Sequence, residues 1–579
     1  MSKRSLSPQD LPPAKRLHIA LPKTSQKHVS IVDALYDELI LSIFSYLSWF
    51  DLCVTQLINR TWARLAVDNE LWRIQYLLTF GKPRLRGVRG PTIRPGSREV
   101  KPLPVRARVN ESVYKDWKWM FRISSNWRKG RCSIEELPCP SRLALSQSRN
   151  RDKFSRHLLL TSNLTITASS RPSYGPVIHV TGPTESCSIV CRPDDTILCR
   201  ITTLVNDQSI LTADHSRVLS FLSTGEFMCY RFKHSPLSST LLFRSSIPGS
   251  HLIPVTQAVY HHPLLITLSQ DFTLALYSLE FNSVNLTQTL SSFTSFPPVS
   301  MVLSTPSPTI YKLVLAYAIP VYPRHWTVGA TELMISGTTM TVDSAPGPAL
   351  QDSSLSFANQ SKSQTLTVCS TRSARAVDVP FGWVDERKLR IMREQWGRKV
   401  TSVADIQTDG KWIILSPGDQ LTGLENRLVS PGSALNPSYP SPMPKLDDPD
   451  GSQMNPFTAP SLHSPTSLQL YRLILPPQNS VSSSPPRLSF VRTLHGQTGP
   501  VTALSLSDGR CVSSGLNGSI WVWDLEAGTG AEVATASLDS IDGLVLGPDA
   551  ELIKGSVSFD ERRLIITQTD NVVVRRFDV

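Results

Sequence analysis

Three cysteines, Cys187, Cys191 and Cys199, lie close together in the chain, and thiols at short spacing can bind a metal ion. A structural zinc site needs four ligands, and no second Cys or His pair follows these three at a suitable spacing. The surrounding residues have the composition of strands. We therefore expect buried thiols, with no metal ion and no cofactor bound.

The histidines show no catalytic arrangement. His215 and the pair His261-His262 have no carboxylate at a spacing that singles them out. The sequence contains no P-loop, no H-E-x-x-H motif and no nucleophile elbow. It predicts a protein that is not an enzyme.

Several Ser-Pro steps are candidate sites for proline-directed phosphorylation, namely Ser7, Ser430, Ser441, Ser464 and Ser484. Such dipeptides are also frequent in plain Pro/Ser-rich linkers. Both interpretations stay open.

The chain has 579 residues, of which 40% are hydrophobic and 18% charged, as in a soluble protein of several domains. No apolar run reaches the roughly 18 residues of a membrane span, so no membrane partner is expected. The first residues have no apolar core and do not resemble a secretory signal. Nine scattered cysteines, an odd number, suggest reduced thiols.

Positive charge is concentrated at the N-terminal end. Residues 1–131 hold 24 basic and 10 acidic residues, a net charge of +14 within a total of +12. We expect a disordered basic N-terminus at 1–30 and a basic flexible loop at 82–109, which is rich in Gly and Pro. The pairs Lys3-Arg4 and Lys15-Arg16 resemble a bipartite nuclear-import signal, so we expect the protein in the nucleus and/or the cytoplasm.

The first folded element that the sequence predicts is a set of three short helices. In the first helix the apolar residues fill an arc of about 160°, wider than a surface helix normally shows. They are Leu39, Ile40, Ile43, Phe44, Tyr46 and Leu47. Asp51 is placed to cap a second helix that extends to Leu65, and Asp68 to cap a third with Leu71 and Trp72.

A unit of about 45 residues is near the lower limit for an independent core, so a surplus apolar face should be covered. The cover is either another chain or the rest of this protein.

The motif order resembles the F-box over nearly its full length. The matching residues are Leu35-x-x-Glu38, Ile43-Phe44-Ser45-Tyr46-Leu47, Asp51-Leu52, Arg60-x-Trp62-x-x-Leu65-Ala66 and Leu71-Trp72. The sequence departs from the family at Tyr36 and at Trp49-Phe50, where prolines are usual.

The resemblance implies an F-box at 31–80 that binds a Skp-family adaptor and, through it, a cullin–RING ubiquitin ligase. It implies that the surplus face is the adaptor-binding interface. The residues assigned to that interface are Leu35, Leu39, Ile43, Phe44, Leu47, Leu52, Leu57, Ile58, Trp62 and Leu65.

A further helix is predicted at 110–131, where Tyr114, Trp117, Phe121 and Trp127 recur at helical spacing. The segment is similar to the linker helix that joins the F-box to the propeller in F-box/WD-repeat proteins. Its aromatic residues are expected to pack rather than to bind.

Beyond residue 132, short β-branched and aromatic runs alternate with turn signals, which predicts an all-β region at 132–579. Residues 493–528 resemble one WD repeat. The structural hydrogen-bond network of that family would fall on Gln497, Ser513, Asn517 and Trp523. Two of these four residue types differ from the usual ones, so we expect a weakened network.

Other runs end like that repeat, at 226–232, 273–279, 467–473 and 571–579, with weaker candidates near 158–168 and 327–336. Together they predict a WD-like β-propeller of seven blades. The length per blade exceeds the usual value, so we expect inserts near 340–365 and 418–465.

The last strand, 571–579, needs a partner on its open side. In propellers that partner precedes the first complete blade. We expect it between about 135 and 170, with 156–162 as the most strand-like run.

The predicted function is the substrate-recognition subunit of an SCF-type E3 ubiquitin ligase. The F-box would bind the adaptor and the propeller would bind the protein to be ubiquitinated. Some related propellers read phosphorylated substrates through an arginine cluster, which cannot be matched here residue by residue.

The alternative is a nuclear propeller scaffold whose basic loop, 82–108, binds nucleic acid. That loop has no aromatic residue to stack on bases, which argues against sequence-specific binding.

Overall fold

The computed structural model describes residues 35–81, 116–137, 155–339, 364–418, 466–535 and 555–579. Short gaps within these ranges are 162–163, 192–196, 210–214, 246–252, 281–282, 293–294, 308, 322–324, 378–381, 476–484, 527 and 569–570. The basic pairs near the N-terminus, the basic loop, the Ser-Pro serines named above and almost all of both predicted inserts lie outside the described residues.

The chain divides into two compact units. The first contains residues 1–80 and 116–118, and the second contains 81–115 and 119–579. No helix in the described part is long and apolar enough to cross a membrane.

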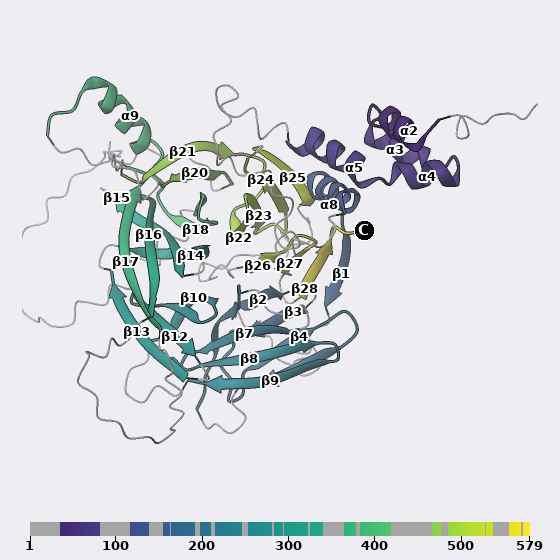
Figure 1. The fold of residues 1–579 in the computed structure, drawn as a ribbon. Helices are drawn as coiled ribbons and strands as arrows, with labels where there is room; N and C mark the ends of the chain where they lie inside the picture. The colour runs from purple at the N-terminus through teal and green to yellow at the C-terminus, as the bar shows by residue number, and fades with distance from the viewer. Residues whose placement is uncertain are drawn as a thin grey trace, which may run out of the picture. The chain divides into compact units, whose positions relative to one another are not determined.

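The first unit is helical (Figure 1). Its helices are α2 (Asp37–Phe44), α3 (Trp49–Thr55), α4 (Arg60–Ala66), α5 (Asn69–Tyr76) and a short π-helical segment (Leu77–Gly81). Helix α4 packs against both α2 and α3. The edge-to-face contact of Phe44 with Trp62, at 5.6 Å between ring centroids, lies at the junction of α2 with α4.

The helix that the sequence predicts from Asp51 to Leu65 is two helices, so there are four short helices rather than three. The backbone N–H of Asp51 donates to Ser48 Oγ at 3.2 Å, which makes Ser48 the cap and places Asp51 inside the first turn. Asn59 then starts α4, because its Oδ1 accepts from the Trp62 N–H at 2.8 Å. The predicted cap Asp68 is confirmed, since its side chain accepts from the N–H groups of Glu70 and Leu71.

The second unit is a β-propeller of seven four-stranded sheets, which confirms the predicted blade number. Blade 1 comprises β2 (Arg156–Thr161), β3 (Leu164–Ser169), β4 (Val177–Thr181) and β5 (Ser186–Val190). Blade 2 comprises β6 (Ile201–Asn206), β7 (His215–Leu222), β8 (Phe227–His234) and β9 (Leu237–Arg244). Blade 3 comprises β10 (Val255–His261), β11 (Leu264–Ser269), β12 (Thr273–Glu280) and β13 (Ser283–Ser291).

Blade 4 has the longest strands, β14 (Phe296–Ser307), β15 (Ile310–Val321), β16 (His325–Thr339) and β17 (Gln364–Arg375). Blade 5 comprises β18 (Val403–Thr408), β19 (Trp412–Pro417), β20 (Leu468–Ile474) and β21 (Arg487–Leu494). Blade 6 comprises β22 (Val501–Ser507), β23 (Arg510–Gly515), β24 (Ile520–Asp524) and β25 (Thr529–Ala534). Blade 7 comprises β26 (Val557–Phe559), β27 (Arg563–Gln568), β28 (Asn571–Arg576) and β1 (Ser133–Leu137).

The first strands of the blades line the centre of the ring. Each contacts the first strand of the next blade, from β2 through β6, β10, β14, β18, β22 and β26 and back to β2. The four runs that end like the WD repeat in the sequence analysis correspond to third strands, β8, β12, β20 and β28.

The ring closes by pairing strands from opposite ends of the chain, as predicted, but with a different strand. The partner of β28 is β1, antiparallel, with Ser133 opposite Arg576 and Leu137 opposite Val572. The predicted partner, 156–162, is instead β2, the innermost strand of blade 1. An outermost strand is exposed and needs few apolar residues, so choosing the most apolar run selected an inner strand.

Successive strands of each blade run in opposite directions, so the propeller has two distinct ends. Turns between first and second strands lie at one end, and turns between second and third strands lie at the other, together with the connections between blades. Helix α8 (Trp117–Lys129) reaches the first end, where the Trp127 indole N–H donates to the Glu561 carbonyl at 2.9 Å. Trp127 also stacks on Phe577 at 3.6 Å between centroids. We call this end the α8 face.

One helix lies inside the region that the sequence predicts to be all-β. Helix α9 (Glu386–Trp396) lies in the connection between β17 of blade 4 and β18 of blade 5 (Figure 1). Because connections between blades lie at the end opposite the α8 face, we call that end the α9 face.

Candidate functional site

Helix α2 carries two apolar stripes, one buried and one exposed. Ile40 and Phe44, four residues apart, are buried in the core of the helical unit. Leu39 and Ile43, also four residues apart, are 50% and 52% exposed. The second stripe borders the first, because each of its residues precedes a buried one by one position. The helix therefore uses one edge of its wide apolar arc to fold and leaves the other in water.

The structure divides the ten predicted interface residues into three groups. Those exposed are Leu39, Ile43, Leu57 and Ile58, with Leu57 at 86%. Those half-buried are Leu35, Leu47 and Trp62. Those buried in the core are Phe44, Leu52 and Leu65. The three buried residues form part of the core of the helical unit, and the four exposed residues are available to contact another molecule.

Further exposed apolar residues were not assigned to the interface from the sequence. They are Tyr36, Tyr46, Trp49, Phe50, Val54, Val67 and Leu78. Trp49 and Phe50 contact each other edge to face at 6.0 Å between centroids, at the start of α3. The spacing of Phe50 and Val54, four residues apart beside the buried Leu52 and Thr55, was the sequence signal for a second exposed stripe.

One ion pair accompanies this apolar face. Arg64 Nη2 lies 2.5 Å from Asp37 Oδ2 and joins α4 to the first turn of α2. Both side chains are largely exposed, so the pair contributes little net energy and leaves the face predominantly apolar. Such a surface is suited to bind an apolar partner surface rather than a charged one.

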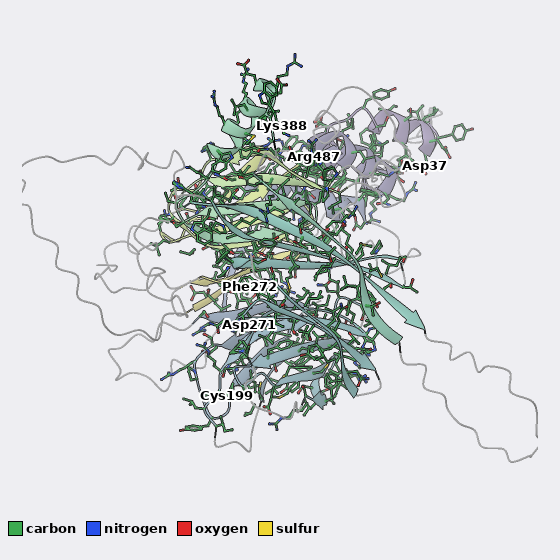
Figure 2. All side chains as sticks on the ribbon, turned by 90° about the vertical axis from the view of Figure 1, so that its left-hand side faces the viewer. Asp37, Cys199, Asp271, Phe272, Lys388 and Arg487 are labelled. Atoms are coloured by element: carbon green, nitrogen blue, oxygen red, sulfur yellow. The ribbon has the colours of Figure 1, made fainter. Side chains whose placement is uncertain are left out.

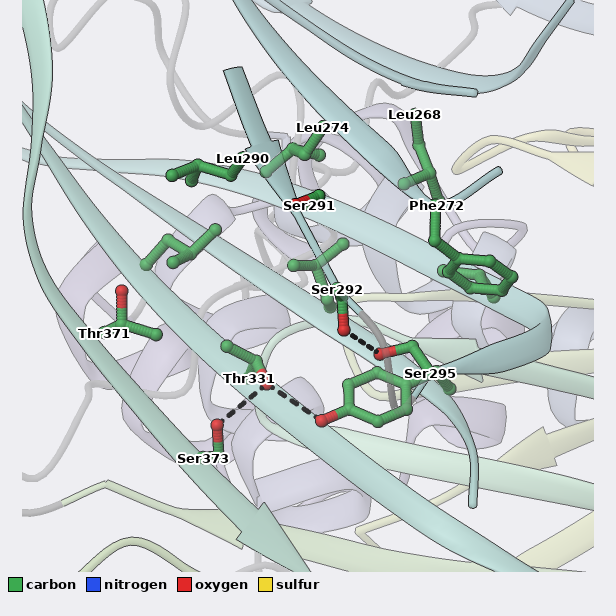
Figure 3. Close-up of a pocket in the computed structure, with 14 residues that line it drawn as sticks. Leu268, Phe272, Leu274, Leu290, Ser291, Ser292, Ser295, Thr331, Thr371 and Ser373 are labelled. Atoms are coloured by element: carbon green, nitrogen blue, oxygen red, sulfur yellow. Dashed lines mark hydrogen bonds between the residues drawn. The ribbon is translucent and has the colours of Figure 1, made fainter. Parts of the chain in front are cut away.

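The propeller offers a concave site between blades 3 and 4 (Figure 3). A cavity of about 350 Å³ is lined by apolar side chains that include Leu268, Leu274, Leu290, Val299 and Leu333. Phe272, in the turn between β11 and β12, and the connection from β13 to β14 also line it, which places it toward the α9 face.

Hydroxyl groups supply the polarity of this cavity. Thr331 Oγ1 lies 3.0 Å from the Tyr317 hydroxyl and 3.1 Å from Ser373 Oγ, and Ser292 Oγ lies 2.9 Å from Ser295 Oγ. None of the lining residues in the described part of the chain carries a formal charge. The cavity is therefore suited to a neutral group, because a buried charge there would have no partner.

The four predicted network residues of blade 6 lie together, joined by one residue that was not predicted. The Trp523 indole N–H donates to Ser513 Oγ at 2.9 Å, and the Ser513 hydroxyl donates to Gln497 Oε1 at 2.7 Å. The Gln497 amide donates to Ser519 Oγ at 2.8 Å, and the Ser519 hydroxyl donates to Asn517 Oδ1 at 2.7 Å. Ser519 bridges two neutral amides, and the resulting chain of hydrogen bonds holds the blade together.

The predicted histidines lie in structural positions. The backbone N–H of His262 donates to Asp207 Oδ1 at 3.1 Å, and Arg217 pairs with the same buried carboxylate at 3.5 Å. Burial, and then the nearby Arg217 charge, lower the pKa of His262. The cluster joins blades 2 and 3.

The three cysteines considered as ligands are free thiols. Cys191 and Cys199 are buried in the core between blades 1 and 2, and burial raises the pKa of Cys191. No cluster of potential metal ligands occurs among the described residues.

Two family models match separate parts of the chain. Residues 35–77, which hold the exposed stripes, match the F-box-like model. Residues 192–392, from the approach to blade 2 through most of α9, match the F-box protein pof12 beta-propeller model. No curated protein matches the chain.

Solved structures resemble the chain only distantly. A chain of the mitotic checkpoint complex is 10% identical, covers 77% of this chain and 93% of its own length, and has a TM-score of 0.35. BamB from Moraxella catarrhalis is 10% identical, with coverage of 77% and 98% and a TM-score of 0.32. The computationally designed Ika8 protein is 10% identical, with coverage of 74% and 97% and a TM-score of 0.29. At TM-scores below 0.5 these similarities carry no argument about function.

Proposed function

We propose that this chain, an F-box protein whose second unit is a seven-bladed β-propeller, is the substrate-recognition subunit of an SCF-type E3 ubiquitin ligase. F-box domains generally bind a Skp-type adaptor. In this proposal the helical unit binds that adaptor and the propeller binds the protein to be ubiquitinated. The chain itself is a non-catalytic receptor, which acts by holding a substrate near the catalytic partner subunits.

This proposal rests on the exposed stripe of α2, together with Leu57 and Ile58. These four residues lie within the stretch that matches the F-box-like model, and each is at least half exposed. Leaving large apolar side chains in water forgoes about 1.5–3 kcal/mol for each one that a partner could bury fully. A partner that buries these side chains would explain why the helical unit leaves them exposed.

The alternative of a nuclear scaffold rests on the loop at 82–108, which lies outside the described residues, and no observation favours it. The proposed location remains the nucleus and/or the cytoplasm.

The adaptor-binding face can be tested with the full-length chain and a purified Skp-type adaptor, by calorimetric titration. In the Leu39→Ala/Ile43→Ala variant we expect affinity to fall at least 100-fold, because buried apolar anchors supply most of an interface's energy. Its melting temperature should barely change, since both side chains are half exposed.

The matched control is Leu241→Ala/Leu286→Ala. These two leucines are 55% and 57% exposed but lie on outer strands of the propeller. The control should bind the adaptor as the unmodified chain does. Unchanged affinity in the Leu39/Ile43 variant would overturn the proposal.

A further inference from the structure

Helix α9 is fixed to the propeller along one side. Leu389, Met392 and Trp396 share a face of the helix, on which Met392 is buried, Trp396 half-buried and Leu389 38% exposed. The segment that follows is bound in place, because Val400 and Trp326 exchange backbone hydrogen bonds of 3.0 and 2.7 Å. The Arg398 guanidinium also lies 4.2 Å from the centre of the Phe490 ring. The helix is therefore a built part of the α9 face.

The outward side of α9 combines cations with an apolar residue. Arg387, Arg390 and Ile391 share this side, at the spacing of neighbours on a helix, and the Arg390 side chain is 84% exposed. Ile391 is 55% exposed, and Trp383, three residues before the helix, is 93% exposed. Lys388, labelled in Figure 2, and Arg393 are exposed as well.

Positive charge is in excess on this surface. Residues 383–399 hold six basic and three acidic side chains. Glu386 lies in the first turn, where the helix dipole favours an anion. Glu394 lies 3.9 Å from Arg390 and 3.7 Å from Arg398. Arg387, Lys388 and Arg393 take part in no ion pair among the described residues.

The chemistry of the helix distinguishes between three classes of anionic partner. An anionic membrane would need a continuous exposed apolar side on the helix, and on α9 the centre of that side, Met392, is buried and Trp396 is half-buried. A nucleic-acid backbone has a phosphate at every nucleotide, so some phosphates would face Asp385, Glu386 and Glu394, which repel them, whereas a peptide can have an uncharged side chain at those points. An acidic peptide can place carboxylates beside the cations, and an apolar side chain on Ile391, while avoiding Glu394.

We propose that the outward side of α9 binds an acidic peptide segment of the protein substrate that contains an apolar residue. The carboxylates pair with Arg387, Lys388, Arg390 and Arg393, and the apolar side chain packs against Ile391 and Trp383. This inference rests on the proposed function, since it names the substrate class that the propeller takes. Arg387, Arg390 and Arg393 are three residues apart and suit a row of carboxylates, because three residues advance a helix by about 4.5 Å.

The probe is a fluorescein-labelled peptide with the sequence Glu-Asp-Glu-Leu-Glu-Asp-Glu, titrated with the full-length chain and followed by fluorescence anisotropy. The Arg387→Glu/Lys388→Glu/Arg393→Glu variant should bind at least tenfold more weakly, and Ile391→Ser about threefold more weakly. Binding should weaken as salt is raised, because the charges are exposed. A peptide with Gln and Asn in place of Glu and Asp should not bind.

The control variant, Arg171→Glu/Arg200→Glu/Arg231→Glu, reverses three exposed arginines near blades 1 and 2 and should bind the probe normally. Equal affinity of the α9 variant and the unmodified chain overturns the proposal. So does tighter binding of single-stranded RNA or of phosphatidylserine vesicles than of the peptide, when the same α9 variant abolishes it.

Adaptor binding separates the two proposals. All α9 variants should bind the Skp-type adaptor normally, and the Leu39→Ala/Ile43→Ala variant should bind the peptide normally. Loss of peptide binding in the α9 variant alone supports the α9 proposal whatever the adaptor result. Normal adaptor binding by the Leu39/Ile43 variant overturns only the proposed function.

Discussion

The helical unit and the propeller differ in where they leave their apolar residues. In the described part of the chain, 25 large apolar side chains are exposed, and eleven of them fall between residues 36 and 78. The propeller, several times longer, has the other fourteen. The propeller buries its apolar residues between neighbouring blades, as Leu164, Ile166 and Ile201 show in one shared cluster. Four short helices have no comparable interior.

The difference shows two uses of the same residue types. In the ring, each blade covers its neighbour, so apolar residues supply stability within the chain. In the helical unit, α4 packs against only one side of α2, and the other apolar side of α2 stays available to a partner. A substitution should therefore affect folding in the first region and binding in the second.

Removing the end of the ring should have the largest effect. A chain truncated after residue 560 loses β27 and β28, and with them the partner of β1 and the Phe577 ring that stacks on Trp127. We expect the propeller to lose its cooperative thermal transition in circular dichroism, because both neighbours of blade 7 lose their contact surface.

The helical unit of that truncated chain should still bind the adaptor. Removal of residues 578 and 579 alone, which lie beyond β28, is the control. It removes only the hydrogen bonds that the Val579 carbonyl accepts from Arg122 and Asn126, so the melting temperature should fall far less. If the chain truncated after 560 melts like the full-length protein, the contribution of ring closure to stability has been misjudged.

A buried ion cluster in blade 4 should give the next largest effect. The Glu332 carboxylate is nearly fully buried and pairs with Lys312 at 3.1 Å and with Arg372. In Glu332→Ala both cations lose this buried carboxylate, and we expect the free energy of unfolding measured in urea to fall by about 3 kcal/mol.

The control for that measurement is Glu226→Ala. Glu226 pairs with Arg244 at 3.4 Å, but the Arg244 side chain is 43% exposed, so the loss should stay below about 1 kcal/mol. Equal losses in the two variants would show that burial does not decide the contribution of these pairs.

The sequence predicted the blades well where one strand type has a recurrent pattern. Third strands such as β8 and β12 combine β-branched or aromatic residues with a following turn, so most blades were visible through that strand. Blade 1 was indicated only by the weaker run near 158–168, which is its first two strands. The outermost strand β1 was not visible, because four of its five residues are exposed and only Ile134 and Leu137 are apolar. Helix α9 was also missed, although Leu389, Met392 and Trp396 have helical spacing and Gly397 follows them.

The candidate interface was predictable only in part. The resemblance assigned Leu52 and Leu65 to the interface in the same way as Leu39 and Ile43. Which of them face inward depends on α4 packing against α2 and α3, a tertiary contact that periodicity does not contain. The break between α3 and α4 was equally hidden, because it depends on the Asn59 side chain accepting from the Trp62 N–H.

The smallest effect is expected at the ion pair of the helical unit, which is the exposed counterpart of the Glu332 cluster. Asp37 and Arg64 are 2.5 Å apart, but their side chains are 46% and 63% exposed, so water screens the attraction. A double-mutant cycle with Asp37→Asn and Arg64→Ala should give a coupling energy of about 0.5 kcal/mol in urea denaturation, falling further in high salt. Asp37→Asn alone should also lose part of the favourable interaction of an acidic residue with the α2 dipole, so its effect should exceed the coupling. A coupling above about 2 kcal/mol would mean that this pair is shielded from water, and that polar contacts as well as apolar ones stabilise the helical unit from within.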